Sequence, residues 1–122
     1  MRRVTVRRSA DGGGLEVRAG DRVLGQVSRL QSVSETEMTG SFAHSPAYAD
    51  FASEMLKLLR AKAAGNGDEV ARLRTALEAA GVQVWHTSHD MRIDRPQTLD
   101  IADGKVSFTP NDSFLMMRTG GL

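Results

Sequence analysis

Three histidines and one carboxylate are the residues whose types could support metal chemistry. His86, His89 and Asp90 lie close together in the chain, and His44 stands far from them. Imidazoles and carboxylates are common ligands of zinc and of non-haem iron. A metal-dependent enzyme or metal-binding protein that uses His44, His86, His89 and Asp90 is therefore one functional hypothesis.

The spacing of the two neighbouring histidines weighs against joint ligation. On a continuous strand, His86 and His89 point to opposite faces because their separation is odd. A turn at Thr87-Ser88 is needed to bring the two rings together, and these residue types permit one without requiring it. Without that turn, the histidines belong to a strand end and bond to the backbone or to water.

Other catalytic patterns have weaker support. The chain has no cysteine, which excludes thiol catalysis and disulfides, and it has no glycine-flanked nucleophile turn. Ser45 precedes a proline and is better explained as a helix cap. Arg92 stands between Asp90 and Asp94, which favours a solvated charge ladder over a catalytic carboxylate pair. The sequence leans towards a protein that is not an enzyme, and it implies no cofactor.

The first quarter of the chain is basic. Residues 1–30 carry seven arginines and three acidic residues, whereas the remainder has a small excess of acidic residues. Nucleic-acid binding through Arg2, Arg3, Arg7 and Arg8 is a second alternative hypothesis. It is disfavoured because non-specific binding needs many phosphate contacts, and residues 1–30 contain no aromatic side chain for base stacking.

Strands are expected on both sides of a helical middle. Alternating apolar residues predict strands around Val4 and Val6, at residues 15–18 and at residues 23–27, and a polar strand or two over residues 30–42 with a bulge at Gly40. After the helices, alternation predicts strands at residues 82–86, 91–94, 99–101 and 106–108. Asp103-Gly104 supplies the turn of the last hairpin.

The middle of the chain predicts two antiparallel helices. Ser45-Pro46 is a helix start, and apolar residues then follow a spacing of three and four. Gly65-Asn66-Gly67 ends this helix, Asp68 is the expected cap of the next, and Gly81 closes it. Most side chains of such a stripe belong to the core, although Tyr48, Phe51 and Met55 could line a ligand groove.

A short apolar segment near the C-terminal end suggests an interface. Phe114, Leu115, Met116 and Met117 are apolar on both faces of an expected strand. Such a strand lies inside a sheet that is covered on both sides, or at a subunit contact. The segment therefore predicts self-association, with a homodimer as the simplest form.

These observations define the expected protein. A chain of 122 residues with 40% hydrophobic residues and a net charge of +1 predicts a single α+β domain over residues 1–122. We expect an antiparallel β-sheet with a two-helix (αα-hairpin) layer packed on one face, in the order strands, helices, strands. No apolar run is long enough to span a membrane, so a soluble cytoplasmic protein is expected. The favoured function is a non-catalytic binding or protein-interaction module that self-associates.

Overall fold

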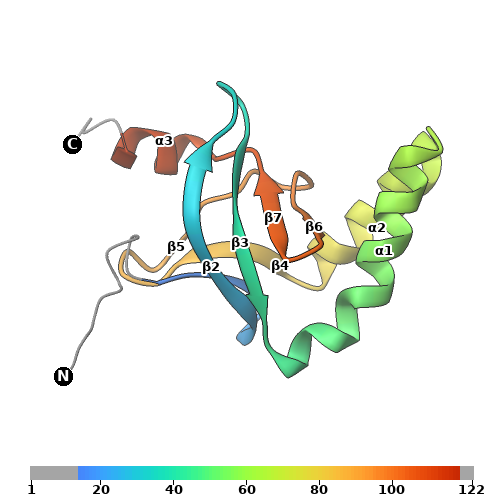
Figure 1. Cartoon of the computed structure of the whole chain (residues 1–122), viewed down its shortest axis with the longest axis horizontal. Coiled ribbons are helices and arrows are strands. Elements are labelled where there is room, and N and C mark those ends of the chain that lie inside the picture. Colours follow the sequence, from blue (N-terminus) through green and yellow to red (C-terminus); the bar gives the residue numbers. More distant parts are fainter. Residues whose placement is uncertain (1–13, 119–122) are drawn as a thin grey trace.

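A computed structural model describes residues 14–118 of the chain (Figure 1). Strands precede and follow a pair of helices, as the sequence predicts, and a further helix ends the described part. The elements are β1 (Leu15–Ala19), β2 (Arg22–Ser32), β3 (Met38–His44), the 3₁₀ helix η2 (Pro46–Tyr48), α1 (Ala49–Ala63), α2 (Gly67–Ala79), β4 (Val82–His86), β5 (Met91–Arg92), β6 (Asp100–Ala102), β7 (Lys105–Phe108) and α3 (Asp112–Arg118). The strand expected around Val4 and Val6 lies outside the described residues.

The seven strands form one antiparallel sheet in the order β5-β4-β1-β2-β3-β7-β6. The sheet curls into a half-barrel, so that the long β2–β3 hairpin runs across the direction of β4 (Figure 1). The helices α1 and α2 pack against each other and contact the sheet at β6 and β4. The predicted α+β class and the predicted helical hairpin are both confirmed.

The segment that follows β5 contacts the segment that follows β7. We call this contact the seam, and it joins residues 93–95 to residues 109–111. It consists of an isolated antiparallel bridge between Asp94 and Pro110 and of two backbone hydrogen bonds of 2.8 Å, from the Arg95 amide to Thr109 and from the Asn111 amide to Ile93. The seam therefore draws the half-barrel towards closure at one end.

The helical hairpin ends and restarts within three residues. Gly65 has a φ of +71°, the left-handed conformation that glycine adopts without strain, and it follows the C-cap of α1. The side chain of Asn66 accepts a hydrogen bond of 3.2 Å from the Glu69 amide, so Asn66 caps α2. Asp68, the cap expected from the sequence, instead lies in the first turn of α2.

Charged side chains attach both helices to the sheet. Asp100 of β6 forms ion pairs with Lys62 of α1 and with Arg74 of α2. Arg74 also donates a hydrogen bond of 2.7 Å to the carbonyl of Leu99. At the other margin, Glu78 of α2 pairs with Arg92 of β5. The helices are therefore attached to both edge strands of the sheet, β6 and β5.

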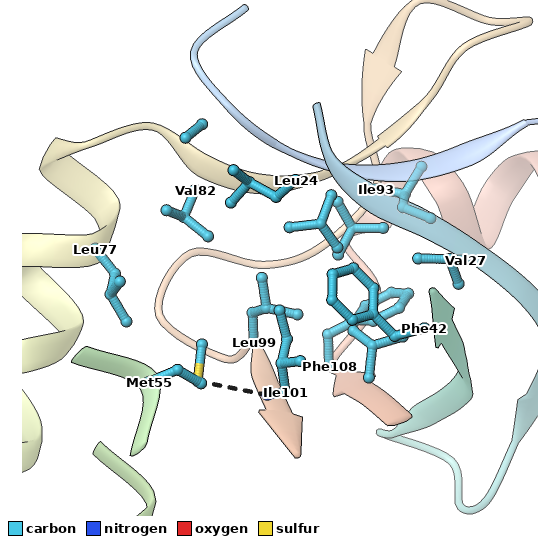
Figure 2. Packing of buried hydrophobic residues seen from close by; sticks show 14 of the residues in the cluster. Leu24, Val27, Phe42, Met55, Leu77, Val82, Ile93, Leu99, Ile101 and Phe108 are labelled. Atoms are coloured by element: carbon cyan, nitrogen blue, oxygen red, sulfur yellow. Dashed lines mark hydrogen bonds between the residues drawn. The ribbon is translucent and has the colours of Figure 1, made fainter. Parts of the chain in front are cut away.

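The core fills the space between the curled sheet and the helices. Figure 2 shows Leu24, Val27, Phe42 and Phe108 packed together inside the sheet, while Met55 reaches the same cluster from α1. A Cβ on Gly25 would lie 2.4 Å from the Phe42 ring, so glycine is required where this ring crosses β2. The close approach lets Phe42 fill the centre of the half-barrel.

Asp94 is the most deeply buried charged residue of the core, with 1% of its surface exposed. Its Oδ1 accepts hydrogen bonds of 2.9 Å from the Val84 amide and from Nε of Arg92. Burial raises the pKa of Asp94, and the bonds from Arg92 and Val84 oppose that rise. The carboxylate substitutes for a missing backbone acceptor beside β4, which gives it a structural role.

Candidate functional site

A groove of about 370 Å³ lies between α1, the end of β3 and the β6–β7 turn. We call it the α1–β6 groove. Most of its surface is apolar, and each of the three surrounding elements contributes side chains. Its lining comprises Phe42, His44, Tyr48, Ala52, Met55, Leu56, Leu59, Ile101, Ala102, Asp103 and Gly104.

The chain reaches the groove through a sharp change of direction after β3. The amide and the hydroxyl of Ser45 donate to the carbonyls of Leu24 and Val23, at 2.8 and 2.7 Å. Ser45 therefore fixes the chain to β2 and does not cap the helix with its side chain, which corrects the expectation from the sequence. Pro46 begins η2 as expected, and η2 carries Tyr48 back against the end of β3.

Aromatic packing sets the position of Tyr48. Its ring meets that of Phe42 edge to face, with centroids 5.4 Å apart, and it lies 6.1 Å from the ring of His44. Edge-to-face contacts of this kind stabilise aromatic pairs beyond their burial. Burial also raises the pKa of Tyr48, so the phenol stays protonated at neutral pH and can donate a hydrogen bond.

Three polar side chains of the groove are available to bind a ligand. Within residues 14–118, the side chains of His44, Tyr48 and Asp103 form no hydrogen bond and no ion pair. Asp103 occupies the β6–β7 turn with a φ of +53°, and Gly104 follows with a φ of +74°, as the predicted Asp-Gly turn requires. The groove thus combines apolar walls with one carboxylate, one phenol and one imidazole.

The four residues of the metal hypothesis do not come together. His44 ends β3, and β1 and β2 separate that strand from β4, which carries His86. No group of three or more histidine, cysteine or acidic side chains in residues 14–118 is arranged to hold a metal ion. The proposed four-residue cluster is therefore absent from the described part of the chain.

The structure does bring His86 and His89 together. The chain turns at residues 87–90, where Asp90 has a φ of +51°, and the two Nδ1 atoms lie 3.3 Å apart. The backbone amide of His89 also donates to Nδ1 of His86, at 3.3 Å. Nδ1 of His86 is then an acceptor, so its proton resides on Nε2. Burial and the neighbouring His89 lower the pKa of His86, which favours the neutral form of His86.

The predicted interface segment has a different structure from the one expected. Phe114, Leu115, Met116 and Met117 belong to the helix α3 and not to a strand. Asn111 explains the difference, because its Oδ1 accepts a hydrogen bond of 2.9 Å from the Phe114 amide and so starts the helix. Phe114 is buried in the core, whereas Met116 is 62% exposed.

Arg2, Arg3, Arg7 and Arg8 lie outside the described residues, so the nucleic-acid hypothesis stays a prediction. Of the side chains expected to line a groove, Tyr48 and Met55 do so, and Phe51 packs near the guanidinium of Arg22 instead. The sequence did not predict that His44 and Asp103 line this groove, because the two residues come close only when β3 pairs with β7 in the sheet.

Comparisons with protein-family models, with curated proteins and with solved structures find no match for this chain. Among the described residues, no helix has the length and apolar character needed to cross a membrane.

Proposed function

We propose that this protein is a non-catalytic binding module whose α1–β6 groove takes a small amphipathic molecule. The single observation that carries the proposal is the combination of apolar walls with three unpartnered polar side chains in one hollow. A volume of about 370 Å³ lies within the range of small-ligand sites. Apolar walls supply binding energy, while a few convergent polar groups orient the ligand.

The polar groups favour binding over nucleophilic catalysis. His44 contributes the one imidazole of the described lining, yet this lining contains no serine, threonine, cysteine or lysine that the imidazole could activate. Asp103 and Tyr48 are suited to fixing a ligand head group, since a carboxylate accepts hydrogen bonds and a protonated phenol donates one. The expected ligand has an apolar body and a head that carries a positive charge or hydrogen-bond donors.

A titration with 2-phenylethylamine tests the proposal, with nuclear magnetic resonance of the backbone amides as the readout. We expect saturable shifts at Tyr48 and Gly104. Ala52→Phe fills the groove and should abolish them, whereas Ala63→Phe, at an exposed position of the same helix outside the groove, should leave them intact. Shifts that survive Ala52→Phe, or that never saturate, would contradict the proposal.

The role of the carboxylate can be tested separately. Asp103→Asn preserves a residue type that tolerates a positive φ and removes the charge. We expect it to weaken binding of 2-phenylethylamine and to leave binding of the neutral 2-phenylethanol unchanged. Equal effects on the two probes would show that Asp103 does not select the head group.

We also propose that the protein self-associates, as expected from its C-terminal apolar segment. The helix α3 supports self-association, because Met116 on this helix is 62% exposed although Phe114 is buried. We expect sedimentation equilibrium at micromolar concentration to give twice the chain mass of 13.2 kDa, and Met116→Glu to reduce it. A wild-type mass of one chain would overturn this proposal without affecting the groove.

A further inference from the structure

A second hollow, of about 230 Å³, lies on the face of the sheet opposite the core. We call it the β2–β7 pocket, since it extends from β2 across β3 to β7. Apart from one glycine, its lining residues have polar or basic side chains, and none of them lines the α1–β6 groove. The lining residues are Arg29, Gln31, Thr39, Gly40, Ser41 and Lys105.

Strand register places the pocket residues beside one another. Ser41 of β3 stands opposite Lys105 of β7, and Thr39 stands opposite Gln31 of β2. Residues that are directly opposite in an antiparallel pair have neighbouring side chains on one face. Ser41 and Thr39 also share a face, because they are two residues apart on one strand. A polar patch therefore spans three strands.

A β-bulge adds Arg29 to this patch. Between the paired residues Ser28 and Gln31, two residues of β2 oppose the single residue Gly40 of β3, and Arg29 adopts a φ of +56°. A Cβ on Gly40 would lie 2.9 Å from the Ser28 carbonyl oxygen, so the bulge requires glycine there. Bulges redirect side chains and are frequent beside functional sites. A positive φ in arginine also has an energetic cost that a function can explain.

The charges of the pocket are uncompensated. Within the described residues, the side chains of Arg29 and Lys105 form no hydrogen bond and no ion pair. The pocket lining contains no carboxylate, whereas three other hollows on the described part of the chain each include at least one. Lys105 also borders a hollow that includes Glu37, Asp100 and Asp103. It forms no ion pair with these three carboxylates, and Asp100 is already paired with Lys62 and Arg74.

We propose that the β2–β7 pocket binds one phosphoryl group of a small phosphorylated molecule. The Arg29 guanidinium offers a planar set of donors that matches two phosphate oxygens, and the Lys105 ammonium adds a mobile charge. The Ser41 hydroxyl and the Gln31 amide supply neutral donors. The Thr39 hydroxyl already donates to the Val106 carbonyl at 3.0 Å, so Thr39 lines the pocket and does not donate to the ligand.

The two cationic side chains of the pocket favour a small phosphorylated ligand over a nucleic acid. Non-specific nucleic-acid binding draws on roughly 6–10 phosphate contacts, and the pocket provides two cations. Its lining also has no aromatic side chain on which a base could stack. One phosphoryl group, bound with a weak salt dependence, matches this arrangement better.

A titration with inorganic pyrophosphate, followed by nuclear magnetic resonance at about 50 mM and about 200 mM sodium chloride, tests the proposal. We expect saturable shifts at Ser41 and Lys105, with a modest loss of affinity at higher salt. Lys105→Gln and Arg29→Asn should each weaken binding by about tenfold, since each removes a charged hydrogen-bond donor. Asparagine is chosen because it tolerates the positive φ at position 29.

Two control variants show whether pyrophosphate binds in this pocket. Lys57→Gln removes an exposed lysine of α1 that does not line the pocket, and Ala52→Phe blocks only the α1–β6 groove, so both should bind pyrophosphate like the wild type. Pyrophosphate binding that Lys105→Gln and Arg29→Asn leave unchanged would overturn the proposal, as would an absence of saturable shifts. Tighter, steeply salt-dependent binding of a 20-nucleotide single strand would favour a nucleic-acid surface instead and would also overturn it.

Discussion

At the scale of single residues, His86 couples the stability of the fold to pH. Its pKa is lowered from the ordinary value of 6.5 by burial and by the neighbouring His89, so the folded chain binds this proton more weakly than the unfolded chain. The stabilisation is complete above pH 6.5 and declines as the pH falls from 6.5 towards the folded-state pKa. Equilibrium urea unfolding at about pH 7.5 and about pH 5.5 measures the decline.

A variant isolates this contribution from other groups that titrate in the same range. His86→Gln retains a side-chain acceptor for the His89 amide and cannot be protonated. We expect the free energy of unfolding of His86→Gln to depend less on pH than that of the wild type. An unchanged pH dependence would show that another group is responsible.

Gly25 provides a steric prediction at the same scale. A methyl group there would lie 2.4 Å from the Phe42 ring and 2.7 Å from the Ala43 carbonyl oxygen, and the ring is enclosed by the core. We expect Gly25→Ala to reduce the free energy of unfolding by about 1–3 kcal/mol. Gly67→Ala is the matched control, because nothing lies within 4 Å of a Cβ at that position. Similar unfolding midpoints for both variants would contradict the prediction.

At the scale of elements, Asp100 determines how firmly the helical hairpin is held. Its carboxylate joins β6 to Lys62 and Arg74, and the Arg74 side chain is only 11% exposed. Asp100→Ala leaves that guanidinium nearly buried with one partner fewer, so we expect a loss of about 1–3 kcal/mol. Amide hydrogen exchange in α1 and α2 should accelerate in parallel.

The exposed pair of Glu69 and Arg72 supplies the comparison for Asp100. These residues form an ion pair within α2, where water screens the charges. Arg72→Ala should therefore change the unfolding midpoint little. A larger effect of Arg72→Ala than of Asp100→Ala would contradict the anchoring role of Asp100.

Elements that depend on neighbouring residues could be predicted from the sequence, and elements that depend on distant contacts could not. The helical hairpin and the Asp103-Gly104 turn follow from local spacing and backbone preference, and both are confirmed. The four apolar residues of α3 carry no clear period, and only the Asn111 cap shows that they start a helix. The bulge at Gly40 was predicted, but its consequence for Arg29 depends on the register of β2 with β3.

The candidate sites repeat this distinction. Tyr48 and Met55 could be assigned to a groove because one helical segment presents both. His44 and Asp103 join them only after β3 has paired with β7, a contact between residues that are 64 to 70 positions apart in the chain. The turn that joins His86 to His89 was permitted by Thr87-Ser88, and nothing in the sequence required it.

At the scale of the whole molecule, the seam decides whether the curled sheet behaves as one cooperative unit. Asn111 forms three hydrogen bonds at or beside the seam. Its amide donates to the Ile93 carbonyl, and its Nδ2 donates to the Arg92 carbonyl at 2.8 Å. Its Oδ1 accepts from the Phe114 amide and so caps α3. Asn111→Ala should cost about 1–2 kcal/mol, because a seam bond and a helix cap are lost together.

Asn111→Asp separates these two contributions. The carboxylate can still accept from the Phe114 amide at the start of α3, but it cannot donate to Arg92. We therefore expect Asn111→Asp to retain part of the stability that Asn111→Ala loses. The Arg95 amide, which bonds to Thr109 across the seam, should exchange faster in both variants than in the wild type. If exchange at Arg95 is unchanged while α3 frays, Asn111 acts only as a cap and the seam closes without its side chain.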